Sequence, residues 1–180
     1  METSKKILAL DSSGLVASVA VVEGNSTYSN LLAEYTVNYK KTHSQTLLPM
    51  LDEIANMTEL DLTTIDAIAI AAGPGSFTGL RIGSATAKGL GLALKKPLIS
   101  IPTVDALAYN LYGTDRLICP IMDARRNQVY TGIYEFRGNT MEVLEPQMAV
   151  DIEVIAEKLC ERQRDVIFLG DGVPVFKDKL

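Results

Sequence analysis

The alternation of apolar and polar residues predicts the strands and helices of the first part of the chain. Short apolar runs between turn residues predict strands, and apolar residues at helical spacing predict helices. In chain order we expect three strands, a helix, a strand, a glycine-rich helix, a strand and a last helix, at 6–10, 16–22, 30–39, 42–57, 67–72, 78–94, 97–101 and 102–112. The first six elements follow the order βββαβα.

The same order then starts again. The pattern predicts three strands, a helix and a strand followed by a glycine turn, at 116–122, 128–136, 141–148, 151–161, 166–169 and 170–172. A duplicated βββαβα unit predicts an α/β protein with two similar halves, each a mixed sheet covered by helices. We place the halves at 1–113 and 114–180. The second half is expected to be abbreviated, because the chain ends where its last helix should begin.

The segment 66–96 is the most distinctive part of the chain. Its apolar run at 67–72 predicts a strand buried on both faces, and Gly73-Pro74-Gly75 predicts a sharp turn. The helix that follows has no acidic residue, and its small residues form two rows, at 79, 83, 87 and 91 and at 85, 89 and 93. An interior glycine destabilises a helix by about 1 kcal/mol relative to alanine, so close packing must offset the cost of the several glycines in this helix. Such a helix is expected to contact more than one neighbour.

Composition and charge exclude several classes of protein. The formal net charge is −5 and the basic residues form no dense run, so nucleic-acid binding by the chain alone is not expected. Cys119 and Cys160 lie at unrelated positions in apolar surroundings, which predicts free thiols in a reducing cytosol. The apolar run at the N-terminus is interrupted by Asp11 and makes a poor signal peptide. We expect a cytoplasmic protein with no membrane span.

The glycine turn has two interpretations. A turn between a strand and a helix can bind an anion through backbone N–H groups, which would make a weak phosphate loop. Its spacing, G-x-G-x-x-x-G, matches neither a dinucleotide fingerprint nor a Walker A loop, so a tight turn for packing is the other interpretation. The residues of the possible phosphate loop are Asp11, Ser12, Gly73, Gly75 and Ser76.

The carboxylates at two strand ends also have two interpretations. Asp11 and Asp123 could hold magnesium or orient a water. Alternatively, Asp11 bonds the turn that follows it, and Asp123 pairs with Arg125 or Arg126.

No metal or cofactor is predicted. His43 is the chain's one histidine, and Leu47 occupies the position where a two-histidine metal site needs its second ligand. Ser76 does not lie in the G-x-S-x-G pattern of a nucleophilic serine.

The helix predicted at 44–57 has more apolar surface than one buried face requires. Its apolar residues span about half the circumference, against a core-facing stripe somewhat over 100° wide. The excess is either a second face for a partner or the sign of a helix buried deep in its own domain.

Longer motifs carry a resemblance to known proteins. The aspartate-ended first strands and the two Gly-x-Gly turns resemble the actin-like ATPase superfamily, with its ribonuclease H-like fold. ILALDSS, THSQTLLPMLDEI, DAIAIAAGPGSFTGLRIGSATAKGLGLAL and MDARRNQVYTGIY resemble the TsaB (YeaZ) family of bacteria. The resemblance implies a role in making threonylcarbamoyladenosine beside the tRNA anticodon. It implies a non-catalytic subunit that pairs with a TsaD-like paralogue, is joined by a TsaE-like ATPase, self-associates alone and meets tRNA only through the complex.

The resemblance also implies where the partner binds. The family's partner surface is built from its first two helices, which gives as interface residues Ser44, Leu47, Leu48, Leu51, Ile54, Gly79, Arg81, Gly83 and Ala87. The alternative is an enzyme of the same superfamily, either a free-standing ATP-dependent phosphotransferase or a glycoprotease-like hydrolase.

Overall fold

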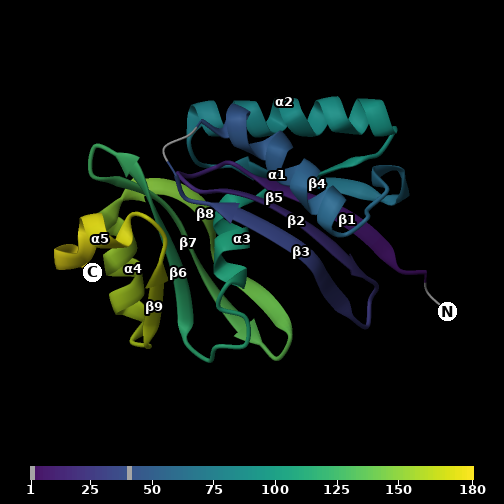
Figure 1. Cartoon of the computed structure of the whole chain (residues 1–180). Coiled ribbons are helices and arrows are strands. Elements are labelled where there is room, and N and C mark those ends of the chain that lie inside the picture. The colour runs from purple at the N-terminus through teal and green to yellow at the C-terminus, as the bar shows by residue number, and fades with distance from the viewer. Residues whose placement is uncertain (1–2, 40–41) are drawn as a thin grey trace. The chain divides into compact units, whose positions relative to one another are not determined.

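The computed structural model describes residues 3–39 and 42–180, and the chain forms two units, 1–101 and 102–180 (Figure 1). This division lies earlier than the expected 113/114 boundary, because helix α3 (Thr103–Tyr109) packs on the second sheet. Val104 and Ala108 are buried in a cluster of second-unit side chains. The hydroxyl of Tyr134 also donates a hydrogen bond of 2.7 Å to Asp105 Oδ1. Helix α3 therefore belongs to the second unit.

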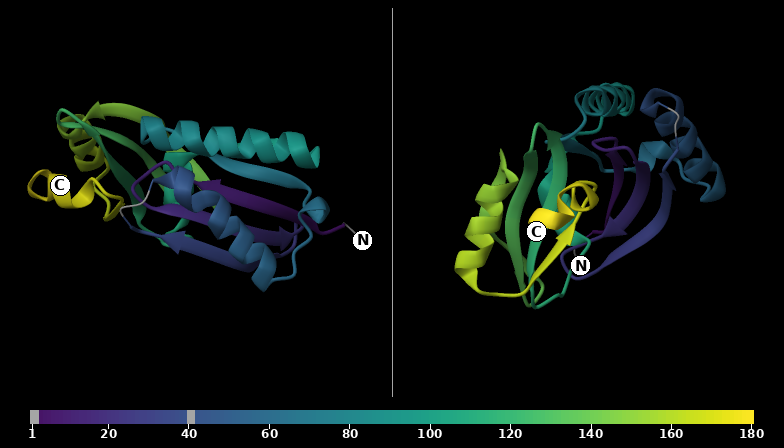
Figure 2. Two further views of the ribbon diagram at one scale, coloured as in Figure 1. Left: turned by 45° about the horizontal axis from the view of Figure 1, so that its top comes forward. Right: turned by 90° about the vertical axis from the view of Figure 1, so that its left-hand side faces the viewer.

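The first unit is a five-stranded mixed sheet in the order β3-β2-β1-β4-β5. Strand β1 pairs antiparallel with β2 and parallel with β4. Helices α1 and α2 lie over the same face of the sheet (Figure 2). The elements are β1 (Lys5–Asp11), β2 (Ala17–Gly24), β3 (Ser29–Val37), α1 (His43–Met57), the 3-10 turn Leu62–Thr64, β4 (Ala67–Gly73), α2 (Phe77–Leu94) and β5 (Leu98–Pro102).

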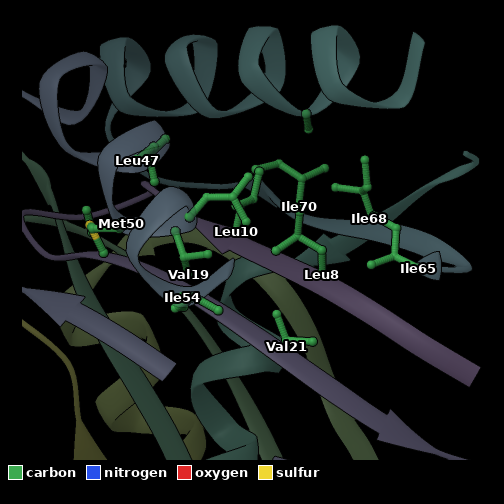
Figure 3. Close-up of a cluster of buried hydrophobic side chains, with 13 residues drawn as sticks. Leu8, Leu10, Val19, Val21, Leu47, Met50, Ile54, Ile65, Ile68 and Ile70 are labelled. Atoms are coloured by element: carbon green, nitrogen blue, oxygen red, sulfur yellow. The ribbon is translucent and has the colours of Figure 1, made fainter. Parts of the chain in front are cut away.

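The core of this unit lies between the sheet and its two helices (Figure 3). Alternate residues of the strands point to the helices, as the two-residue period of a strand requires. Strands β1, β2 and β4 and both helices contribute buried apolar side chains, including Leu8, Leu10, Val19, Val21, Leu47, Leu51, Ile54, Ile68, Ile70 and Ala87. Strand β4 is buried along nearly its whole length, which confirms the prediction from its continuous apolar run.

The second unit repeats the arrangement with fewer residues. Its sheet has the order β8-β7-β6-β9, in which β6 is antiparallel to β7 and parallel to β9. Helix α4 packs on the sheet through Ile152, Ile155 and Leu159. The elements are β6 (Leu117–Arg125), β7 (Gln128–Arg137), β8 (Thr140–Asp151), α4 (Ile152–Arg162), β9 (Val166–Leu169), α5 (Val173–Phe176) and the 3-10 turn Lys177–Lys179.

The matching strand orders and the sequence of elements confirm the predicted duplication of a βββαβα unit with a mixed sheet. Across the described residues, the helices are too short or too polar to traverse a lipid bilayer.

Candidate functional site

The glycine turn before α2 packs directly against the turn between β1 and β2. The N–H of Ser76 donates to the carbonyl oxygen of Ser13 at 2.6 Å, and Ser12 Oγ donates to the carbonyl oxygen of Gly79 at 2.9 Å. The N–H of Gly79 donates to Ser76 Oγ at 3.3 Å. Two amides that a phosphate would need are therefore bonded within the chain. These contacts favour the packing interpretation of the turn over the phosphate loop.

Two glycines make this contact possible. A Cβ atom on Gly75 would lie 2.4 Å from the carbonyl oxygen of Ser13, and one on Gly79 would lie 2.0 Å from that of Ser12. Gly73 has φ +103°, a conformation that glycine adopts without strain. The glycines thus allow two backbones to touch, at the place where the sequence suggested an anion site.

The two strand-end aspartates cap the turns that follow them. Asp11 Oδ1 accepts the N–H of Ser13 at 2.7 Å, and Asp123 Oδ1 accepts the N–H of Arg125 at 2.9 Å. Both are bonds from a side chain to the backbone two residues on. Asp123 thus pairs with Arg125, as the turn interpretation of the sequence expected, and the donor is the backbone N–H.

The glycine turn of the second unit is closed in the same way. The N–H of Gly172 donates to the carbonyl oxygen of Ile121 at 2.9 Å. A Cβ atom on Gly170 would lie 2.4 Å from the same oxygen. In each unit, the glycine turn thus donates an N–H to a backbone carbonyl oxygen. The acceptor is Ser13, between β1 and β2, in the first unit and Ile121, in β6, in the second.

His43 and the cysteines take part in no catalytic constellation among the described residues. His43 Nε2 donates to the carbonyl oxygen of Gly14 at 2.9 Å, which ties the start of α1 to the first hairpin. In the described part of the chain, no three His, Cys, Asp or Glu side chains come together as metal ligands. Burial raises the pKa of the Cys119 thiol to about 12, so it stays protonated and a poor nucleophile.

The predicted interface residues of α1 divide into two groups. Ser44 and Leu48 are exposed, with Leu48 at 52%. Leu47, Leu51 and Ile54 fill the core of their own unit. The expectation that these three belong to an exposed contact surface is therefore corrected, because the sheet already covers that face of the helix.

The predicted interface residues of α2 divide in the same way. Gly79, Gly83 and Ala87 are buried against their own unit, and Arg81 alone of the four is exposed. A Cβ atom on Gly83 would lie 2.3 Å from Ser12 Oγ. The row 79-83-87-91 is therefore the inner face of the helix, and these three positions are also corrected.

The opposite side of α2 is exposed, and Arg81 is the one residue on it that belongs to the predicted interface set. Phe77 is 73% exposed and Leu92 is 83% exposed. The guanidinium of Arg81 lies 5.1 Å from the centre of the Phe77 ring. We define the outer face of α2 as the exposed residues Phe77, Arg81, Ala85, Lys88, Gly89 and Leu92. The second row of small residues, at 85, 89 and 93, was the signal for this face.

Helix α1 also has an exposed side. We define the outer face of α1 as Ser44, Leu48, Asp52, Glu53 and Met57, all of them exposed. Its charges are acidic, whereas the outer face of α2 carries only Arg81 and Lys88. The two outer faces are thus complementary in charge.

The two units, with their matching strand orders and glycine turns, define an actin-like ATPase fold. The family model of TsaD, tRNA N6-adenosine threonylcarbamoyltransferase, matches residues 30–179. The chain is 35% identical over 174 residues to the Bacillus subtilis tRNA threonylcarbamoyladenosine biosynthesis protein TsaB, covering 97% of this chain and 74% of that protein. The Escherichia coli protein of the same name is 30% identical over 183 residues, covering 96% and 74%. This chain belongs to the TsaB (YeaZ) family.

Solved structures agree with this assignment. The crystal structure of a protein with similarity to peptidase YeaZ from Pseudomonas aeruginosa superimposes with a TM-score of 0.82 and 27% identity, covering 98% of this chain and 80% of that one. A second structure, YeaZ from Pseudomonas aeruginosa, gives a TM-score of 0.70 with 29% identity, covering 83% and 68%.

Because each glycine turn already donates an N–H to a carbonyl oxygen of the chain, we predict that the isolated chain does not hydrolyse ATP. The Ser76 and Gly172 amides are bonded to carbonyl oxygens, and no lysine lies in either glycine turn to reach a phosphate. Phosphate release from millimolar ATP should equal the buffer blank. The control is Asp11→Asn, which keeps an oxygen for the Ser13 amide and removes the charge. Turnover of roughly 1–100 s⁻¹, as in ordinary kinases, that Asp11→Asn abolishes would contradict this prediction.

Proposed function

We propose that this chain is a non-catalytic subunit of the complex that forms threonylcarbamoyladenosine in tRNA. It acts in the cytoplasm by forming a heterodimer with a TsaD-like paralogue that performs the transfer. Family membership and the names of the Bacillus and Escherichia relatives support the pathway. The closed glycine turns and the lack of a metal-ligand cluster among the described residues support a non-catalytic role.

One observation carries the proposed mode of action: α2 has an exposed outer face that its own unit leaves uncovered. Leu92 and Phe77 expose most of their side chains at its two ends. Between them lies Gly89, whose Cβ position has no described atom within 4 Å. Glycine in a helix costs about 1 kcal/mol, and no contact with residues 3–39 or 42–180 offsets that cost at this position. Close approach of a partner helix would offset it.

The charges favour a contact that pairs α1 with α2 across the interface. Asp52 and Glu53 of one chain would face Arg81 and Lys88 of the other if the two are related by a twofold axis. A TsaD-like paralogue with the same order of elements would present equivalent helices. The same surface would then serve a homodimer, which competes with the heterodimer. The TsaE-like ATPase and tRNA would join the assembled pair.

A glutamate on the outer face of α2 tests this proposal. Ala85→Glu and Leu92→Glu should fold normally, because both side chains are exposed. An unpaired charge in the contact costs several kcal/mol, against about 8 kcal/mol for a micromolar complex. We therefore expect at least a 100-fold loss of affinity for the paralogue and of tRNA modification, measured by titration and by modification assay with all partners present.

The matched control is Val175→Glu, which places the same charge on an exposed valine of the second unit. It should leave the association intact. If Ala85→Glu and Leu92→Glu both bind the paralogue as tightly as the unchanged chain, the interface lies elsewhere. If the unchanged chain neither binds the paralogue nor supports modification, the function itself is wrong.

A further inference from the structure

The hairpin between β6 and β7 holds three successive residues in a left-handed conformation, and none of them is glycine. The φ values are 69° at Arg125, 53° at Arg126 and 65° at Asn127. Tight turns of this hand between antiparallel strands are usually made by asparagine and glycine. Asparagine fits, but an arginine in this conformation is unfavourable because its Cβ crowds the backbone. The backbone therefore does not explain arginine at either position.

The backbone of this hairpin, residues 123–128, is fixed on both sides. Asp123 Oδ1 accepts the Arg125 N–H, and the Asp123 N–H donates to Asp171 Oδ1 at 3.3 Å. The Ile152 N–H donates to the carbonyl oxygen of Asn127 at 3.2 Å. The glycine turn therefore holds the base of the hairpin at Asp123, and the start of α4 holds its tip at Asn127.

The side chain of Asn127 adds a second clamp. Its Nδ2 donates to Glu153 Oε2 at 2.9 Å, and its Oδ1 accepts from Lys179 Nζ at 2.6 Å. Lys179 also pairs with Glu153 at 2.6 Å. Hydrogen bonding from Lys179 lowers the pKa of Glu153, which keeps the clamp ionised at neutral pH.

The two arginine side chains of the hairpin have no hydrogen-bond or ion-pair partner among the described residues. Both are exposed, and neither guanidinium has an acceptor there. The other arginines of the second unit do have acceptors: Arg116 pairs with Asp165, Arg137 and Arg164 with Glu135, and Arg162 with Glu145. Two consecutive arginines thus have no partner for their guanidinium groups among the described residues, and they lie on a turn whose backbone is held in place by hydrogen bonds.

We propose that Arg125 and Arg126 bind backbone phosphates of the RNA substrate when the chain is assembled with its paralogue. A guanidinium binds phosphate oxygens through two parallel N–H donors, and a fixed hairpin lowers the entropy lost on binding. Residues 123–128 present no large apolar side chain, whereas protein contacts centre on aromatic or aliphatic anchors. The RNA backbone is therefore favoured over an acidic protein surface. This inference rests on the function proposed above.

The surrounding charge limits the contact to one or two phosphates. Asp123 within the hairpin, and Asp171 and Glu153 beside it, each accept a hydrogen bond from a hairpin residue. Asp151, whose backbone pairs with Gln128, is exposed nearby. With a net charge of −5, the chain alone has no general attraction for RNA. The hairpin is expected to position an RNA that the complex already holds.

The test measures tRNA binding by the assembled complex over a range of salt concentrations. Arg125→Gln and Arg126→Gln each remove one guanidinium. Glutamine has a Cβ atom as arginine does, so the cost of the left-handed backbone at these positions stays the same. Each should weaken tRNA binding by about 5- to 10-fold and reduce the slope of log K against log salt by about 1. The double variant should lose about 30- to 100-fold. Affinity for the paralogue, measured in parallel, should not change.

The matched control is Arg116→Gln, which removes an exposed guanidinium that already has a carboxylate partner. It should change tRNA binding less than twofold. Unchanged tRNA binding and salt slope in the double variant would overturn the inference alone. Lost affinity for the paralogue with unchanged tRNA binding by the remaining complex would assign the hairpin to a protein contact and also overturn it. A complex that fails to form with the unchanged chain would overturn both proposals.

Discussion

Gly79→Ala is expected to destabilise the first unit by about 3 kcal/mol or more, whereas Gly89→Ala on the same helix should stabilise it by up to about 1 kcal/mol. The new methyl group at position 79 would lie 2.0 Å from the carbonyl oxygen of Ser12 and 3.2 Å from the ring of His43. The first hairpin would have to move away. That movement would break the bond from Ser12 Oγ to Gly79 and the bond from Ser76 to Ser13.

Gly89 provides the control because its Cβ position is open. Alanine there gains helix propensity, and its Cβ atom would meet no atom of the described part of the chain within 4 Å. Urea unfolding of the two variants, followed by circular dichroism, measures both changes against the unchanged protein. Equal stability of the two variants would mean that the hairpin and α2 do not touch as described. Gly89→Ala should also weaken binding to the paralogue if a partner helix approaches at this position.

The elements of the fold could be predicted from the sequence because their signals are local. The apolar run of β4 and the small-residue rows of α2 each lie within one continuous segment. The duplication could be predicted because the same order of local signals occurs again in the second half of the chain. The unit boundary could not be predicted, since α3 could pack on either sheet. The hydrogen bond between Tyr134 and Asp105 joins residues far apart in sequence.

The candidate surface was harder to predict because each helix has two apolar or small-residue faces. Helical periodicity shows that Leu47, Leu51 and Ile54 share a face, but it does not show what covers that face. For the same reason, the row of α2 that we assigned to the interface is the buried one. Positions 79, 83 and 87 are buried, whereas positions 85, 89 and 93 are exposed. Gly83 and Gly89 look alike in the sequence, yet a Cβ atom on Gly83 would lie 2.3 Å from Ser12 Oγ, whereas one on Gly89 would meet no described atom within 4 Å. The packing partner, which decides between them, is a long-range property.

The hairpin at 123–128 shows a third kind of limit. The segment MDARRNQVY favours a turn, but nothing in its composition indicates that both arginines adopt a left-handed backbone. The hydrogen bonds that hold this hairpin at Asn127 and Asp123 come from partners distant in sequence, in α4, the last 3-10 turn and the glycine turn of the second unit. Local sequence signals are therefore expected to be least informative at a site of this kind.

Leu51→Glu and Leu48→Glu are expected to have opposite consequences, although the two residues lie three positions apart on α1. Leu51 is 4% exposed and packs in the core of the first unit. An ionised carboxylate there has no partner, so we expect a loss of about 4–5 kcal/mol, enough to unfold many domains of this size. Leu48 is 52% exposed, and its glutamate variant should keep the native fold.

The two variants separate folding from association. Circular dichroism and thermal unfolding should show a native Leu48→Glu protein and an unfolded or strongly destabilised Leu51→Glu protein. Size-exclusion chromatography and titration with the paralogue should then show that folded Leu48→Glu has lost affinity, since Leu48 lies on the outer face of α1. A Leu51→Glu protein as stable as the unchanged chain would refute the inward orientation of Leu51. A folded Leu48→Glu that binds the paralogue normally would restrict the interface to α2, because it would show that this part of α1 makes no contact.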